Sequence, residues 1–240
     1  DLREARWSDG TPVTAEDFVT AFRRLMDPAT ASAYAYLFYL IDGAEAVNSG
    51  KAKPETLGVR ALAPRRLELR LNQPAPYLPR LLTHGLAFPV PTHMVRQWGD
   101  GWTRPDRYVS NGPYRLVSWA LGDRVVLARN PQFWDDARTC FDRVSYYPTP
   151  DPVSAERRVK SGELDIGINF ASNRIGYLRG KGGMADYVRV APWLGIYYLA
   201  LNTQRPEFTD LRVRLALSMA IDRDFMTGKL LRAGQQALYG

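Results

Sequence analysis

A paired-strand pattern in the middle of the chain constrains the fold more than any other stretch. Asn111-Gly112-Pro113 is a turn signal, and Tyr114–Ala120 and Arg124–Arg129 follow it as two strands joined by Leu121-Gly122-Asp123. Asn130-Pro131 ends the second strand, because proline has no N–H to donate to a neighbouring strand. We therefore expect a long antiparallel hairpin here, with helices and strands on either side of it.

The residues before this hairpin predict two helical segments and a second strand pair. Thr14 is a candidate N-cap and Asp17 its acidic partner in a capping box, with the helix running over Ala15–Met26. The apolar residues of this helix recur on one face, which predicts packing against a core. Thr30–Ile41 is dense in aromatic residues and predicts a second helix, buried or lining a cleft. Two alternating segments predict the strand pair: Leu57–Leu62 and Arg66–Leu71.

The residues after the hairpin predict further helices and strands. Gly162 predicts the end of a polar helix over Val153–Ser161, and Asp210 predicts the start of an apolar helix over Leu211–Ile221. The glycine-rich residues 175–183 predict a loop. Four short segments predict strands: Phe141–Tyr147, Glu163–Asn169, Tyr187–Val190 and Trp193–Asn202. Interleaved helices, strands and antiparallel pairs together predict a mixed α/β fold.

Composition limits the kinds of protein that this chain can be. Its 240 residues, 45% of them hydrophobic, can bury a sizeable core, and no apolar run reaches the roughly eighteen residues that a membrane-spanning helix needs. The net charge of +7 comes from scattered arginines, which favours a solvated basic surface over a nucleic-acid interface. The chain does not begin with Met and no leader precedes Asp1, so we expect that a targeting segment has been removed. It starts on what resembles the end of a strand and stops just after a predicted helix, so we also expect that both ends are cut from a longer chain.

The motifs of common enzyme and metal sites are absent from the sequence. There is no G-x-S-x-G or H-E-x-x-H motif, and Gly176–Lys181 is followed by Gly182 where a phosphate loop needs Ser or Thr. His84 and His93 are a poor metal pair around a proline-rich segment, and the single cysteine, Cys140, is interpreted as a buried small apolar residue. We therefore predict no enzyme, no cofactor and no metal site. Many Tyr and Trp residues beside polar strand ends favour binding of an extended polar ligand instead.

Several motifs, taken together and in order, resemble one protein family. They are Trp7–Phe18 (WSDGTPVTAEDF), Asp27–Tyr34 (DPATASAY), Asn111–Tyr114 (NGPY), Arg129–Trp134 (RNPQFW), Ser161–Asp165 (SGELD) and Asn202–Arg223. The family is the extracellular solute-binding proteins, family 5, the peptide-binding components of bacterial ABC importers. The likeness covers nearly the whole chain, which resembles in particular the periplasmic oligopeptide-binding proteins.

This resemblance implies how the chain is organised and where it works. It implies two α/β lobes of the type II periplasmic-binding-protein kind around a peptide cleft, with an extra α/β subdomain on the first lobe. Residues 1–91 would be mostly the extra subdomain, 92–193 the first, ligand-binding lobe, and 194–240 the hinge crossing and the start of the second lobe. The resemblance also implies a monomeric periplasmic protein that delivers oligopeptides to an ABC transporter permease in the inner membrane, with no nucleic acid, cofactor or metal.

The resemblance further implies four ligand-contacting residues, which we expect to converge on one open groove. They are Tyr34, Asn169, Trp193 and Tyr198. Trp193 replaces the tyrosine that is usual at its position in oligopeptide-binding relatives, which removes a hydroxyl group there. Other ligands of the family stay open as alternatives, namely a dipeptide, a murein peptide, a nickel chelate or an opine. An enzyme of unrecognised type and a basic nucleic-acid binder are the remaining rival interpretations.

Overall fold

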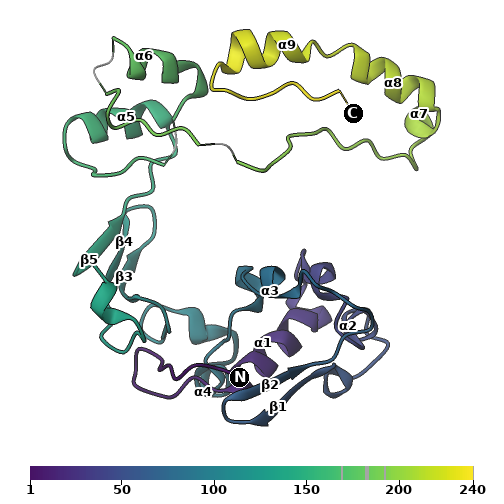
Figure 1. Cartoon of the computed structure of the whole chain (residues 1–240), viewed down its shortest axis with the longest axis vertical. Coiled ribbons are helices and arrows are strands. Elements are labelled where there is room, and N and C mark those ends of the chain that lie inside the picture. The colour runs from purple at the N-terminus through teal and green to yellow at the C-terminus, as the bar shows by residue number, and fades with distance from the viewer. Residues whose placement is uncertain (169, 182–183, 192, 240) are drawn as a thin grey trace. The chain divides into compact units, whose positions relative to one another are not determined.

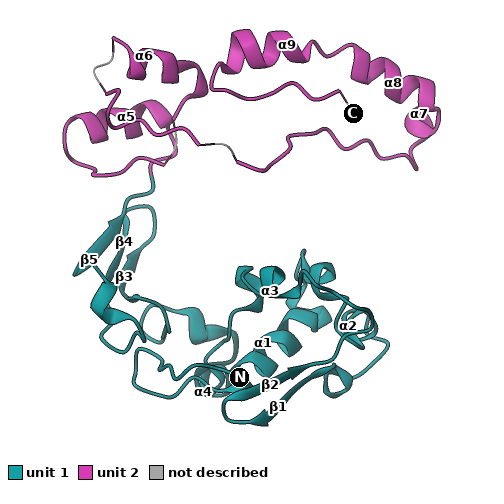
Figure 2. Ribbon diagram, in the orientation of Figure 1, with its two compact units in different colours: residues 1–148 teal, residues 149–240 magenta. Residues whose placement is uncertain are grey.

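The computed structural model describes residues 1–168, 170–181, 184–191 and 193–239 (Figure 1). The chain forms two compact units, unit 1 over residues 1–148 and unit 2 over residues 149–240 (Figure 2). Every strand found in the described residues belongs to unit 1, while unit 2 combines helices with irregular segments. The predicted mixture of helices and antiparallel strands is therefore confirmed for the chain, but its strands are concentrated in one unit.

The core of unit 1 forms around helix α1 (Ala15–Met26). This helix packs against a hairpin of β1 (Val59–Ala63) and β2 (Arg66–Leu69), in which Val59 is paired with Leu69. The largest fully buried side chains of this core are Phe22, Met26, Phe38, Ile41, Val47 and Val59. Unit 1 also contains short helices and 3-10 turns: α2 (Ala44–Asn48), α3 (Leu78–Leu81), and turns at Pro54–Thr56, Gly85–Ala87 and Gly99–Thr103. Helix α1 and the strand pair are confirmed; β1 begins two residues later than predicted, and β2 begins at the predicted residue and ends two residues earlier.

Helix α1 begins at the predicted N-cap, where Thr14 and Asp17 form a capping box. Asp17 Oδ2 accepts a hydrogen bond from the Thr14 backbone N–H at 2.8 Å, and Thr14 Oγ1 lies 3.4 Å from the same oxygen. The buried Asp17 carboxylate also accepts from Trp7 Nε1 at 3.2 Å and from the Thr92 backbone N–H at 3.0 Å. One carboxylate thus joins the turn before α1, the start of α1, and the start of α4 (Thr92–Trp98).

The aromatic segment after α1 is not the helix that was predicted over Thr30–Ile41. It contains one short 3-10 turn at Ala35–Phe38, and another turn, Pro28–Thr30, precedes it. Ala31 has a φ of +49°, in the left-handed region, so a right-handed helix cannot run through this residue. The aromatic residues of this segment divide between core and surface: Phe38 is fully buried and Tyr39 packs against the core, whereas Tyr34 and Tyr36 are exposed.

The central hairpin occupies the predicted residues. Strand β3 (Tyr114–Ala120) pairs antiparallel with β4 (Arg124–Arg129), and β4 pairs with β5 (Arg143–Tyr146), which confirms the strand predicted over 141–147. After β4, the buried Asn130 donates from Nδ2 to the Gly112 carbonyl at 2.8 Å, and its Oδ1 accepts from the backbone N–H two residues on at 3.1 Å. One side chain therefore joins the turn before β3 to the turn after β4.

The helices of unit 2 follow the predictions at two points and depart from them at a third. Helix α5 (Pro152–Lys160) is followed by Gly162 with a φ of +76°, and α8 (Leu211–Met219) begins at Asp210, whose Oδ1 accepts from the Arg212 backbone N–H at 2.8 Å. The others are α6 (Ile175–Arg179), in place of the predicted loop, α7 (Pro206–Thr209), α9 (Arg223–Phe225) and a π-helical turn, Met226–Leu231. Across the described ranges, no helix has the length and apolarity needed to cross a membrane.

The strands predicted for unit 2 are wrong as far as the structure describes them. Residues 163–168, 187–190 and 193–202 adopt no strand, and the described part of unit 2 holds no strand that could pair with them. A strand is stable only when a neighbour satisfies its backbone N–H and C=O groups. These three segments therefore lack, in the described part of unit 2, a neighbouring strand with which they could form a sheet.

Candidate functional site

The predicted ligand residue Tyr34 lies in unit 1, immediately before the 3-10 turn Ala35–Phe38. Ala35 and Phe38 are buried, and the Phe38 ring meets Phe22 of α1 edge-on with ring centroids 5.4 Å apart. The anchored turn leaves Tyr34 57% exposed, with its ring centroid 6.4 Å from that of Tyr36. Tyr34 is thus an exposed side chain on a well-packed support, not a member of the core.

The predicted ligand residues Trp193 and Tyr198 lie in unit 2, in the segment 193–202, which runs as a long drawn-out trace between α6 and α7 (Figure 1). Trp193 is 89% exposed and Tyr198 is 74% exposed. The same segment exposes four further large side chains: Leu194, Ile196, Tyr197 and Leu199. An aromatic surface and a backbone with no strand partner in the described residues therefore occur together here.

The fourth predicted ligand residue, Asn169, lies outside the described residues. Tyr34 belongs to unit 1, whereas Trp193 and Tyr198 belong to unit 2. The structure describes each unit by itself, so the convergence of the four residues on one groove stays a prediction. The structure shows that the three described residues, Tyr34, Trp193 and Tyr198, are exposed.

A buried ion cluster that the sequence analysis missed lies in unit 2. The Glu156 side chain is 5% exposed; its Oε2 accepts from Arg174 Nε at 2.7 Å, and its Oε1 accepts from Arg174 Nη2 and Lys160 Nζ, both at 2.9 Å. Arg174 and Lys160 also lie over the Tyr177 ring, 5.0 and 5.2 Å from its centroid. The hydrogen bond from Arg174, with a smaller effect of Lys160, lowers the pKa of Glu156 from 4.5 to about 2, although burial acts in the opposite direction.

The sequence indicates the Glu156–Lys160 pair of this cluster but not the Glu156–Arg174 pair. Glu156 and Lys160 are four residues apart on α5, a spacing at which helical side chains of opposite charge meet. Arg174 is 18 residues from Glu156 and lies beyond α5, so no local pattern predicts the pair.

The two histidines make contacts within unit 1. His84 Nδ1 accepts from the Leu86 backbone N–H at 3.2 Å, and His93 Nε2 lies 2.7 Å from Asp9 Oδ2. Burial acts to raise the pKa of Asp9, but hydrogen bonds from the Thr11 backbone and from His93 lower that pKa overall. Within the ranges that the structure describes, no three His, Cys, Asp or Glu side chains gather as they would around a metal ion.

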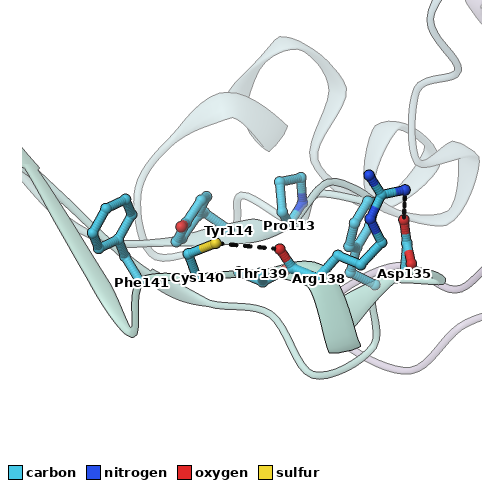
Figure 3. Close-up of a pocket in the computed structure, with 8 residues that line it drawn as sticks. Pro113, Tyr114, Asp135, Arg138, Thr139, Cys140 and Phe141 are labelled. Atoms are coloured by element: carbon cyan, nitrogen blue, oxygen red, sulfur yellow. Dashed lines mark hydrogen bonds and ion pairs between the residues drawn. The ribbon is translucent and has the colours of Figure 1, made fainter.

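An open hollow of about 450 Å³ lies beside the base of the central hairpin (Figure 3). Its lining residues are Pro113, Tyr114, Phe133, Asp135, Arg138, Thr139, Cys140 and Phe141. Cys140 is exposed here, with Sγ 3.7 Å from the Arg138 carbonyl oxygen, so the prediction of a buried cysteine was wrong. The reason is its place in the fold, because the short link between the 3-10 turn Asp136–Arg138 and β5 puts Cys140 at the rim of the hollow rather than under a sheet.

Comparison with known proteins places this α/β chain among the solute-binding proteins of bacteria. The sequence matches the family described as "Bacterial extracellular solute-binding proteins, family 5 Middle" over residues 1–240. The chain therefore belongs to the bacterial extracellular solute-binding proteins, family 5. This confirms the resemblance that the six motifs indicated.

The similar proteins include periplasmic peptide-binding proteins of known structure. The chain is 43% identical to the periplasmic oligopeptide-binding protein OppA of Salmonella typhimurium, over 99% of this chain and 44% of that protein. The structure of Burkholderia pseudomallei OppA matches with a TM-score of 0.90 and 37% identity, over 97% of this chain and 46% of that chain. The Escherichia coli murein tripeptide binding protein MppA matches with a TM-score of 0.90 and 38% identity, over 97% and 45%.

These matches confirm the predicted fold class, a fragment of the periplasmic peptide-binding-protein fold. The chain spans 44% of the length of Salmonella OppA, which is less than half. The term whole protein is used below for a chain of the relatives' length that contains residues 1–240. Its activity is therefore a proposal.

Proposed function

We propose that the whole protein is the substrate-binding component of a bacterial ABC importer. It binds oligopeptides in a cleft between two lobes and delivers them to a permease in the inner membrane. The observation that carries this proposal is the 43% identity to OppA of Salmonella typhimurium over 99% of this chain. In this proposal the protein is periplasmic and monomeric, and it acts by binding, without catalysis or a cofactor.

The surface of residues 193–202 supports peptide as the ligand class. A peptide carries its own N–H and C=O groups, so it can hydrogen-bond to a backbone segment that has no strand partner of its own, whatever the peptide's side chains are. Trp193 and Tyr198 place large apolar rings beside that backbone, where they can pack on peptide side chains of varied chemistry. Closing a second lobe over the peptide removes competing water, which strengthens each hydrogen bond.

The proposal assigns roles to four residues and three segments. Tyr34, Asn169, Trp193 and Tyr198 contact the peptide. Residues 1–91 form mostly the extra subdomain, 92–193 the first lobe, and 194–240 the hinge crossing and the start of the second lobe. The exposure of Tyr34, Trp193 and Tyr198 supports their assignment, since a ligand contact has to be reachable.

A second candidate is another ligand of the same family. The TM-score of 0.90 to the murein tripeptide binding protein MppA favours a murein peptide within this group, which also includes dipeptides, nickel chelates and opines. The backbone-directed contacts proposed above suit linear peptides and murein peptides alike, because both present peptide groups. Identification of the bound ligand is therefore needed to distinguish the two candidate functions.

Mass spectrometry of the ligand that stays bound when the whole protein is purified under native conditions tests this proposal. We expect a mixture of linear peptides of varied sequence. A single murein peptide, a metal complex or an opine would establish the second candidate instead. Peptides that are cut during incubation would contradict a binding protein and indicate an enzyme.

A further inference from the structure

The last part of unit 2, residues 193–239, has no core of its own. The structure describes all of these residues, and none of them is buried. The buried apolar side chains described in unit 2 are Ala155, Leu178 and Val188, and all three precede this part of the chain. Folding has to offset the conformational entropy of the ordered residues, and burial of apolar surface is the main favourable contribution. The helices of residues 193–239 therefore need a partner.

Helix α8 carries the apolar face that such a partner can cover. Spacings of three and four residues place five apolar side chains on one side of the chain: Val213, Ala216 and Leu217 on α8, and Ala220 and Ile221 in the turn that follows it. We call this set the α8 face. Arg212 and Arg214 flank it, Val213 is 40% exposed and Leu217 is 44% exposed. This pattern is typical of a helix with one side packed on a core.

The described residues offer α8 little support. Helix α7, immediately before α8, has four residues and packs against it. Helix α8 itself has nine residues. Isolated helices shorter than about 12–15 residues are only marginally stable in water, and most helices in proteins are stabilised by packing of an apolar face. Helix α8 therefore depends on a further contact, and the α8 face provides the apolar surface for it.

We propose that the part of the whole protein outside residues 1–240 packs on the α8 face. Residues 1–240 span 44% of Salmonella typhimurium OppA and 46% of Burkholderia pseudomallei OppA, so more than half of a protein of that length lies outside them. A part of this size is large enough to supply unit 2 with a core. The contact joins segments of one chain, and the inference does not depend on which ligand the protein binds.

A second copy of the protein fits the α8 face less well. The face runs along a helix of nine residues, which is about 14 Å long. A stable interface between separate proteins buries roughly 800 Å² on each partner, more than one side of so short a helix presents. A segment of the same chain is held nearby at a high effective concentration, so a small apolar face is sufficient to bind it.

Photo-cross-linking in the whole protein identifies what covers the α8 face. A diazirine-bearing amino acid of leucine size replaces Leu217, and mass spectrometry maps the cross-linked peptides after illumination of a mixture of isotopically light and heavy protein. We expect cross-links within one chain, to peptides from outside residues 1–240. The same amino acid in place of Arg212 is the matched control. The Arg212 side chain is on the same helix and is 89% exposed, so water should quench the activated group there and the cross-links should be lost.

Val213 is the second position for the cross-linker if the protein altered at Leu217 does not fold, because it belongs to the same face. Cross-links from either position to residues 1–240, or between a light and a heavy copy, would overturn the inference. Equal quenching at Leu217, Val213 and Arg212 would also overturn it, since the α8 face would then be open to water. No peptide ligand takes part in this experiment, so its outcome is separate from that of the proposed function.

Discussion

At the scale of single residues, buried polar side chains join segments that are far apart in the sequence. Asp17 links three segments of unit 1, Asn130 links the two turns that flank the central hairpin, and Glu156 links α5 to the turn before α6. Each is buried with its side-chain oxygens hydrogen-bonded. Substitutions at these positions leave buried donors without acceptors, so their cost exceeds that of surface substitutions.

Asp17→Asn should destabilise unit 1. The carboxylate accepts from Trp7 Nε1 and the Thr14 N–H through one oxygen and from the Thr92 N–H through the other. An amide has only one acceptor oxygen, so at least one of these donors faces an NH₂ group instead. We expect a loss of about 1–3 kcal/mol in the free energy of unfolding for each donor left unpaired, measured by urea titration with tryptophan fluorescence.

The control for this substitution is Asp27→Asn. Asp27 Oδ1 accepts one exposed hydrogen bond, from the Ala29 backbone N–H at 2.9 Å, and an amide oxygen can replace it. Its cost should therefore be clearly smaller than that of Asp17→Asn. Equal costs for the two variants would show that Asp17 does not join its three segments as described.

Thr14→Ala should cost about 1 kcal/mol of unfolding free energy, and Thr14→Ser should cost little. Thr14 occupies the N-cap of α1 and forms the capping box with Asp17, and serine keeps the hydroxyl that alanine lacks. Thermal unfolding of the wild type, Thr14→Ala and Thr14→Ser under the same conditions measures these differences in stability. Indistinguishable melting temperatures for the wild type and the alanine variant would refute the cap.

At the scale of elements, the sequence correctly predicted the helices and strands whose ends are determined by local signals. The capping pair Thr14 and Asp17 fixed the start of α1, and the turn signals around residues 111–131 fixed the hairpin of β3 and β4. The predictions failed where the secondary structure depends on residues that are distant in the sequence. A left-handed Ala31 interrupts the helix expected over residues 30–41, and the strand-like residues 193–202 have no partner strand in the described part of unit 2.

The candidate site was predictable only in part, for the same reason. Tyr34, Trp193 and Tyr198 came from family resemblance, and the structure adds that all three are exposed. Residue type alone gave no means of separating them from core aromatics such as Phe38. The Glu156–Arg174 pair could not be predicted, because it depends on how the chain turns between α5 and α6.

The buried ion cluster of Glu156, Lys160 and Arg174 predicts a dependence of stability on pH. The pKa of Glu156 is about 2 in the folded protein against 4.5 otherwise, so the unfolded state binds the proton more readily. The stabilisation, of the order of 3 kcal/mol, is complete above about pH 4.5 and is lost as the pH falls toward about 2. Unfolding by urea near neutral pH and at about pH 3 should therefore show a smaller loss on acidification for Glu156→Gln than for the wild type. Identical pH profiles would exclude a native ion cluster at Glu156.

At the scale of the whole molecule, residues 1–240 span 44% of the length of Salmonella typhimurium OppA. We expect this chain alone to bind peptide in the millimolar range or not at all. Without a second lobe to exclude water, each hydrogen bond to the peptide contributes only about 0.5–1.5 kcal/mol. A few such bonds have to offset the ordering of a flexible peptide and its lost translational freedom, an estimated 4 kcal/mol or more.

Isothermal titration calorimetry with a mixed pool of tri- to pentapeptides tests the central claim of oligopeptide binding most directly. The whole protein should give a saturable heat of binding, and residues 1–240 should give none under the same conditions. Micromolar binding by residues 1–240 would mean that the main anchor for the peptide lies within this chain. No saturable heat from the whole protein, freed of any bound ligand beforehand, would contradict the assignment of oligopeptides as its substrate.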